Sequence, residues 1–334
     1  MHGNEDTGGG AERIVGLMIN PTSRRTRKHM DRILAIARDR EPLHHCVTAD
    51  GAKVKSGLAD LAAAGVNVLA ICGGDGTVSR VLTFLLEDRP FDPLPLVAIL
   101  PGGTANMTAG DLGLSGPVHR ALRRLREWAE EDRVRPEFLR RSVLRVCPGV
   151  AQPAHCGMFF GAGAIVQGVE YTNANIHSRG LKHELSLGAG LVRSMWGIAR
   201  QDPRFIRPAA VSISIDGRSA EHAPSLVLLL VSSLQRLFLN MRPYWGEEHG
   251  KALHTTIVQS PATRLIRTLP ALLRGKPNRH LTAAAGYRSY NIDRIALGFD
   301  GPFTLDGEIL HASAESGPVE ISVGGELTFL RLPN

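Results

Sequence analysis

The chain of 334 residues (36.1 kDa) is long enough for about two domains, and its 43% hydrophobic and 21% charged residues are typical of a globular protein that buries a core. Its formal net charge of +7 predicts an anionic partner (a nucleotide, a nucleic acid or an acidic membrane surface), while 5% aromatic residues argue against a stacking surface for single-stranded nucleic acid. No apolar run approaches the roughly 20 residues of a membrane-spanning helix, so we expect none.

The first part of the chain alternates between strand and helix patterns. Residues 1–12 are polar and glycine-rich, which predicts a disordered tail. Apolar runs then predict strands at 14–19, 43–48, 66–72 and 96–100, and helical spacing predicts helices at 52–64, 78–86 and 117–131. Four arginines of the last helix, Arg120, Arg123, Arg124 and Arg126, are expected on its solvated side. This alternation predicts a doubly wound α/β domain, which we place at residues 13–140.

The second part is β-rich. Strand patterns occur at 144–146, 211–215, 226–231, 292–297, 304–305 and 319–323, and Asp216-Gly217 predicts a hairpin turn. We expect a β-sandwich domain over residues 141–334, with the end of the chain able to return to the first domain. Two helical stretches, 177–199 and 261–275, interrupt it.

Residues 73–77, Gly-Gly-Asp-Gly-Thr, form the most informative turn, between the strand at 66–72 and the helix at 78–86. Glycine permits positive φ and close backbone approach, and amides at such a helix start can hold a phosphate. The carboxylate of Asp75 would repel a phosphate, so it must accept from a nearby donor or hold a metal. On its own, the motif is equally typical of a tight turn with an aspartate cap.

Two further turns follow strands in the same way. Asn20, Pro21, Thr22 and Ser23 come after the first strand, and residues 101–106, Pro-Gly-Gly-Thr-Ala-Asn, come after the strand at 96–100. In an open α/β sheet, ligands bind at the edge formed by the carboxyl ends of the strands. Three such turns together favour a nucleotide phosphate site.

The order of these motifs resembles the catalytic domain of the diacylglycerol kinase and sphingosine kinase superfamily, and especially its soluble bacterial lipid kinases. A late Asp306-Gly307-Glu308 matches the Asp-Gly-Glu of that family, so the resemblance extends from about residue 14 to about residue 332. It implies a NAD-kinase-like α/β domain followed by a β-sandwich that binds the lipid. It also implies transfer of the γ-phosphate of ATP, with Mg²⁺, to the hydroxyl of diacylglycerol or a related lipid such as a sphingoid base, in phospholipid biosynthesis.

The resemblance assigns most candidate residues to ATP: Asn20, Pro21, Thr22, Ser23, Thr48, Gly73, Gly74, Asp75, Gly76, Thr77, Gly103, Thr104 and Asn106. It assigns catalysis to Asp75, Asp306 and Glu308. Asp306 and Glu308 are two residues apart and would share one face of an extended strand, where one of two neighbouring carboxylates could act as the base. The sequence does not choose between them, and Asp306-Gly307 is also typical of a simple hairpin turn.

Four positions depart from the family pattern. Arg24 stands where the family has glycine, Met107 where it has aspartate and Gly110 where it has arginine. His249 stands where a family aspartate is linked to a structural metal, so we assign no metal residue. These changes leave a different acceptor or reduced activity as alternatives.

Two other functions remain as alternatives. A NAD kinase shares the Gly-Gly-Asp-Gly turn, but its downstream Asn-Glu pair occurs here only as Asn4-Glu5 in the tail. A nucleotide-binding regulator without turnover is motivated by Met107 and His249, and the intact Asp306 and Glu308 weigh against it.

The expected partners are ATP and a lipid at an anionic membrane surface, with no nucleic acid, and a homodimer is left as an alternative to a monomer. The basic, leucine-rich segment 261–275 fits either such a surface or a helix that packs on the core. Four cysteines without metal-ligand spacing indicate a reduced, cytoplasmic protein, and Cys72 is expected in the core.

Overall fold

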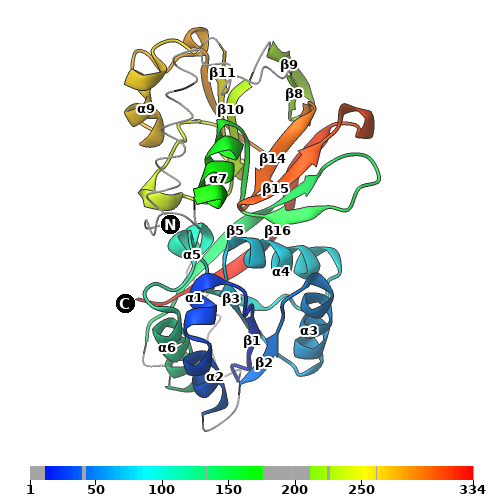
Figure 1. The fold of residues 1–334 in the computed structure, drawn as a ribbon, viewed down its shortest axis with the longest axis vertical. Helices are drawn as coiled ribbons and strands as arrows, with labels where there is room; N and C mark the ends of the chain where they lie inside the picture. The colour runs from blue at the N-terminus through cyan, green and yellow to red at the C-terminus, as the bar shows by residue number, and fades with distance from the viewer. Residues whose placement is uncertain are drawn as a thin grey trace.

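The computed structural model describes residues 12–39, 43–131, 134–175, 197, 211–223, 226–260 and 262–333. The predicted tail at 1–12 and the predicted helix at 177–199 lie outside these residues, apart from Glu12 and Gly197. Two parts are stacked along the long axis, an α/β part and a β-rich part (Figure 1).

The α/β part is built on four parallel strands in the order β2-β1-β3-β4. Helices α3 and α4 pack against one face of this sheet, and α2 and α6 pack against the other. Every residue of β3 is buried, as expected for a central strand covered on both faces. The bounds are β1 Val15–Ile19, α1 Arg24–Lys28, α2 Met30–Arg38, β2 His44–Val47, α3 Gly51–Ala63, β3 Val68–Gly73, α4 Asp75–Glu87, β4 Leu96–Pro101, α5 Met107–Leu112 and α6 Val118–Glu131.

Two long antiparallel strands, β5 (Glu137–Cys147) and β16 (Val319–Arg331), connect the two parts (Figure 1). Near its end β16 lies parallel to β4, with Phe329 opposite Val97. Near its start β16 pairs with β13 (Arg294–Gly298), so one sheet continues from the α/β part into the β-rich part. The boundary proposed at residue 140 lies within β5 and remains a proposal.

The β-rich part is a sandwich. Its second sheet has the order β12-β11-β10-β7-β14-β15, and buried side chains such as Phe160, Leu229 and Phe303 of this sheet pack against Ile213 and Ile295 of the first. The predicted fold class, an α/β domain followed by a β-sandwich, is therefore confirmed. The bounds are β6 His155–Gly157, β7 Phe159–Gly163, α7 Ala164–Asn175, β8 Val211–Ile215, β9 Arg218–Ala223, β10 Leu226–Ser232, η1 Phe238–Asn240, β11 Leu253–Gln259, α9 Leu265–Leu273, η2 Ala283–Ala285, β12 Tyr287–Ile292, β14 Gly301–Leu305, β15 Glu308–Ala312 and η3 Ala314–Ser316.

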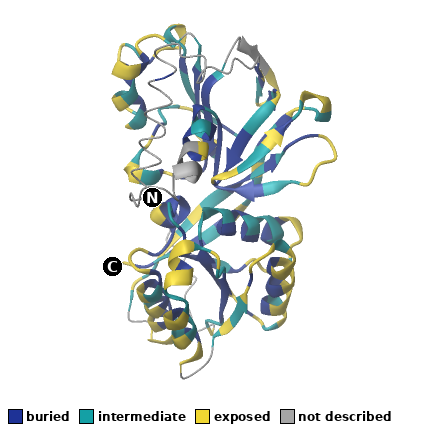
Figure 2. Cartoon of the chain, viewed as in Figure 1, coloured by how far each residue is buried: buried dark blue, intermediate teal, exposed yellow. Residues whose placement is uncertain are grey.

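Burial confirms several local expectations and corrects one (Figure 2). Cys72 is buried, and desolvation raises the pKa of its thiol to about 12, as suits a core residue. The prediction that Arg126 lies on the solvated side of α6 is wrong. Its guanidinium is buried, because it donates to the carbonyl of Ile36 at 2.7 Å and pairs with Glu130 on the same helix. No helix among the described residues has the length and apolar character needed to cross a bilayer.

Candidate active site

The three predicted turns lie side by side at the carboxyl edge of the sheet, where their side chains bond to one another. Asn20 follows β1, and its amide nitrogen donates to the Thr77 hydroxyl at 2.8 Å. The backbone amide of Gly74 donates to the Ser23 hydroxyl at 3.3 Å. These two bonds join the β1–α1 turn to the β3–α4 turn, so residues 51 or more positions apart in the sequence form one surface.

Gly73 and Gly103 of these turns are required by close approach, and neither has positive φ. A Cβ atom on Gly103 would lie 2.3 Å from the Cα atom of Gly74, and one on Gly73 would lie 2.5 Å from the Thr77 side chain. A larger residue at position 103 would therefore separate the β3–α4 turn from the β4–α5 turn. Glycine allows both positive φ and close backbone approach, and these turns use only the close approach.

Asn106 closes the β4–α5 turn. It has the left-handed φ of 51°, its side-chain oxygen accepts from the Gly103 amide at 2.7 Å, and its amide nitrogen donates to the Gly103 carbonyl at 3.2 Å. Its side chain is thus occupied in shaping the turn. Thr104 is half-buried beside it, and Thr48 is buried at the end of β2.

The carboxylate of Asp75 has a clear partner. It accepts from the backbone amides of Met107 at 3.1 Å and Thr108 at 2.9 Å, which are the first two residues of α5. A carboxylate at a helix start satisfies amides that have no partner within the helix. Burial raises the pKa of Asp75, and the two backbone hydrogen bonds oppose that rise.

Asp306 occupies the turn between β14 and β15. Asp306 and Gly307 have φ of 48° and 88°, the two positive values of a type I′ hairpin turn. One carboxylate oxygen accepts from the Met158 amide at 2.9 Å, and the other is buried with no hydrogen-bond partner among the described residues. A Cβ atom on Gly157 would lie 2.5 Å from the first oxygen, so Gly157 makes room for this carboxylate.

Burial raises the pKa of Asp306 well above its usual range, and the negative charge of nearby Asp75 raises it further. Hydrogen bonds from the amides of Met158 and Phe159 act in the opposite direction. An unpartnered oxygen on a carboxyl group with a raised pKa is the arrangement that a general base uses near neutral pH.

The prediction that Asp306 and Glu308 share one face is wrong. The period-two rule applies to extended strands, whereas Asp306 is the first residue of a turn and Glu308 is the first residue of β15. As a result the side chain of Glu308 is 53% exposed, 4.0 Å from Arg80, while Asp306 is only 5% exposed.

Asp75 and Asp306 both line a cavity of about 100 Å³ between the two parts of the molecule, which we call the apolar cavity. Its other walls are almost entirely hydrocarbon and come from β7, α7, β10, η1 and α9, and they include Phe159, Ile165, Leu230, Phe238 and Leu272. Met107 also lines it, so the residue that replaces the family aspartate adds to the apolar wall.

Sequence reasoning did not find the wall residues or Gly157. Their only signal is membership in ordinary strand and helix patterns, because the cavity forms when segments around positions 160, 230, 240 and 272 come together. The predicted helix at 261–275 is confirmed in its central part as α9. Leu272 of α9 is buried and lines the cavity, while Arg264 and Arg267 are exposed.

The residues present fit a magnesium ion that is held mainly by nucleotide phosphates. The described residues contain no group of three or more His, Cys, Asp or Glu side chains that could enclose a metal. Mg²⁺ commonly uses one or two carboxylates together with phosphate oxygens, and Asp75 and the unpartnered oxygen of Asp306 are available for that. His249 is exposed, and we assign it no metal.

Residues 15–134 match the family model described as "Diacylglycerol kinase catalytic domain". The match spans all three turns and the helices that they begin, so the resemblance inferred from the motifs is confirmed over this part of the chain.

Solved structures share the fold of the whole chain. A crystal structure named as a diacylglycerol kinase from Bacillus anthracis str. Sterne superposes with a TM-score of 0.60 at 19% identity, covering 97% of each chain. Two other structures named for the same activity in that organism give TM-scores of 0.63 and 0.61 at the same identity and coverage. No protein of curated function matches the sequence. At this identity the structures establish the fold of both parts.

Proposed function

We propose that the protein is an ATP-dependent lipid kinase that transfers the γ-phosphate to the hydroxyl of diacylglycerol or a related lipid alcohol. The observation that carries this proposal is the apolar cavity, because the two buried carboxylates, Asp75 and Asp306, are the only acidic groups among its described lining residues. Hydrocarbon walls suit an acyl or alkyl chain, and a carboxylate suits the hydroxyl that must lose its proton.

The nucleotide is proposed to bind on the three turns. Backbone amides at the start of α4 and the hydroxyls of Thr77 and Thr104 face the sheet edge where phosphates are commonly held. Mg²⁺, held by phosphate oxygens with Asp75 or Asp306, would neutralise charge on the transferred group. The chain's own contribution is to fix these groups, which the bonds of Asn20, Ser23 and Asp75 accomplish.

Asp306 is our candidate for the general base, in preference to Glu308. Its raised pKa and its unpartnered oxygen suit acceptance of the proton from the acceptor hydroxyl. Glu308 lies outside the cavity lining and is more than half exposed. Asp75 would position α5 against the nucleotide turns, since it holds the first two amides of that helix.

Access to the lipid is proposed to run along α9. Leu272 lines the cavity, and the basic residues Arg264, Arg267, Arg274, Lys276 and Arg279 beside it lie at the surface. Surface cations near a lipid cavity favour transient binding to an anionic membrane surface.

The test is transfer of labelled phosphate from ATP and Mg²⁺, with diacylglycerol, monoacylglycerol, a sphingoid base and NAD offered as separate acceptors. We expect label in one of the lipids, and loss of at least about 100-fold in Asp75→Asn. Lys55→Gln serves as a control, because Lys55 makes only an exposed ion pair with Asp88. Label in NAD alone, or ATP binding without any transfer, would contradict the proposal and favour one of the two alternatives.

A further inference from the structure

A second and larger cavity adjoins the apolar cavity, since Met107, Leu237 and Phe238 line both. Its volume is about 730 Å³, within the range of small-molecule sites. Its walls come from α1, α5, the start of β5 and the end of β16 in the α/β part, and from residues 236–240 in the β-rich part. Asn106 of the β4–α5 turn lines it, whereas Asn20, Asp75 and Thr77 do not, so the cavity adjoins the proposed nucleotide site at that one turn.

Arginine dominates the charge of this second cavity, which we call the arginine cavity. Arg25, Arg135, Arg236 and Arg331 line it, and Glu137 is the one carboxylate among its described lining residues. Glu137 is 3.3 Å from Arg331, so it offsets one of the four positive charges. Cations gathered around a concave surface create a positive potential that attracts an anion.

Arg236 is held in place at the cavity wall. Its guanidinium donates to the Gly110 carbonyl at 2.7 Å and lies 3.5 Å from the carboxylate of Asp111. Asp111 is itself only 6% exposed, and its carboxylate accepts from the backbone amide of Gln235 at 2.9 Å. A buried carboxylate therefore fixes this cation before any ligand arrives, and a fixed donor loses less conformational entropy on binding.

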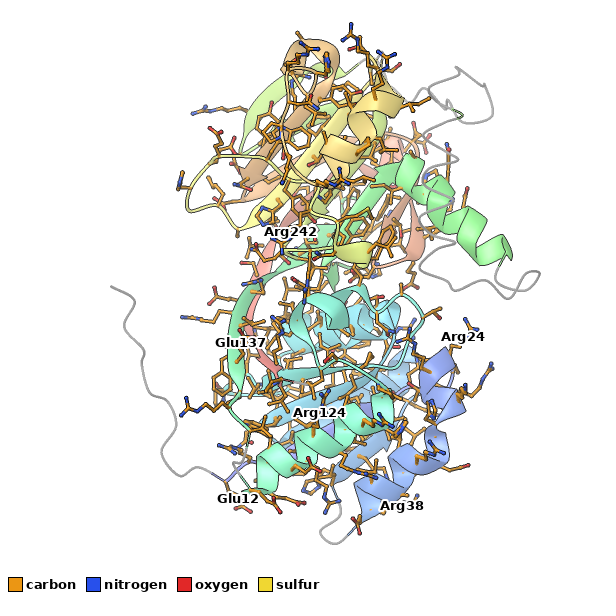
Figure 3. The ribbon with its side chains drawn as sticks, turned by 90° about the vertical axis from the view of Figure 1, so that its left-hand side faces the viewer. Glu12, Arg24, Arg38, Arg124, Glu137 and Arg242 are labelled. Carbon is orange, nitrogen blue, oxygen red and sulfur yellow. The ribbon has the colours of Figure 1, made fainter. Side chains whose placement is uncertain are left out.

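Hydrogen bonds from Arg124 hold another part of the cavity wall in place, and Arg135 keeps its hydrogen-bond donors available for a ligand. Arg124 on α6 donates to the carbonyls of Ser115 and Pro333, and both of these residues line the cavity. Figure 3 shows Arg124 on α6, with Glu137 higher up on β5. Arg135 makes no hydrogen bond or ion pair with any residue that the structure describes.

Apolar side chains also line this cavity. Leu114, Leu237, Phe238 and Leu332 face the same cavity as the arginines. We propose that the arginine cavity is a second ligand site, which binds a phosphate-bearing anion with an apolar body. The phosphate group would bond to Arg135, Arg236 and Arg331, because guanidinium groups match the geometry of phosphate oxygens. The source of that phosphate is either a lipid headgroup or a soluble phosphorylated molecule.

The test is titration calorimetry on the full chain without nucleotide, with three probes. The probes are phosphatidylglycerol with two hexanoyl chains, phosphatidylcholine with the same chains, and inorganic phosphate, with both lipids kept below their micelle concentrations. We expect the anionic lipid to bind at least about tenfold more tightly than the zwitterionic one. Inorganic phosphate that binds as tightly as the anionic lipid, at the same residues, would show that the apolar wall adds no affinity and would overturn the proposed apolar body of the ligand.

Arg135→Gln and Arg331→Gln should each weaken binding of the anionic lipid about tenfold. Arg294→Gln is the matched control, since Arg294 is exposed, pairs with Glu320 and does not line the cavity. Leu230→Trp, which narrows the apolar cavity, should leave this binding unchanged, so failure here is distinguishable from failure of the proposed kinase function. Equal binding of the two lipids, unchanged affinity in both arginine variants, or loss of binding in Leu230→Trp would overturn the proposal.

Discussion

In the α/β part, the groups proposed to hold ATP come from three short turns, each beginning within a residue or two of a strand end. In the β-rich part, the walls of the apolar cavity come from β7, α7, β10, η1 and α9, which span more than 100 residues of sequence. The turns need particular residue types at adjacent positions, because their backbones touch. The cavity needs only bulk hydrocarbon, which many sequences supply. A motif can therefore identify the first region and not the second.

Asp75 and Asp306 connect the two regions. Asp75 belongs to a turn of the α/β part and Asp306 to a hairpin of the β-rich part, and both face the apolar cavity. Their proximity is reflected in the pKa of Asp306, which the charge of Asp75 helps to raise. If the proposed function is correct, substitutions in the three turns should affect ATP, and substitutions in the apolar cavity should affect the lipid.

The largest effect should come from filling the apolar cavity. Leu230→Trp places a larger ring where the acceptor chain is proposed to lie, so we expect about a 100-fold loss in kcat/KM for the lipid. The dissociation constant for ATP should not change, because Leu230 belongs to β10 and takes no part in the bonds that shape the three turns. Val323→Trp is the control, since Val323 is exposed on β16. Equal losses for lipid and ATP would show that the two regions are not separable.

A smaller effect should come from the basic face of α9. Each exposed cation near an anionic bilayer contributes about 1 kcal/mol, so Arg264→Gln with Arg267→Gln should weaken binding to anionic vesicles by about 30-fold in a sedimentation assay. The control pairs Arg140→Gln with Arg294→Gln, two exposed arginines that are ion-paired elsewhere on the molecule. Unchanged vesicle binding in the α9 variant would contradict the proposed role of this helix.

Particular residues show how far the sequence could predict this structure. The four parallel strands, helices α3, α4 and α6 and the three turns were predicted near their observed positions, because local periodicity and glycine placement determine them, whereas α2, β7 and β11 were not predicted. The prediction that Asp306 and Glu308 share one face of a strand was wrong, since a type I′ turn changes the direction of the chain between them. The burial of Arg126 depends on the carbonyl of Ile36, which is 90 residues away in the sequence. Such contacts between distant segments leave no local pattern.

The smallest effect concerns stability. The pKa of Asp306 in the folded chain lies above its unfolded value near 3.9, so its contribution to stability is complete below that pH and is lost as pH rises through the folded pKa. An amide side chain at this position would carry no charge at any pH. In Asp306→Asn, the melting temperature relative to the native chain should therefore increase from pH 4 to pH 8, by about 2–4 °C. A difference that stays constant or decreases over this range would contradict the burial of an unpaired carboxylate.

The most direct test of the proposed site compares Asp306→Asn with Glu308→Gln in the transfer of phosphate from ATP to the lipid acceptor. The two residues are neighbours in one hairpin, and they differ in that Asp306 is buried in the cavity wall and Glu308 is exposed. We predict that kcat falls at least about 100-fold in Asp306→Asn and by less than about tenfold in Glu308→Gln. A large loss in Glu308→Gln with nearly full activity in Asp306→Asn would contradict the assignment of the base to the buried carboxylate.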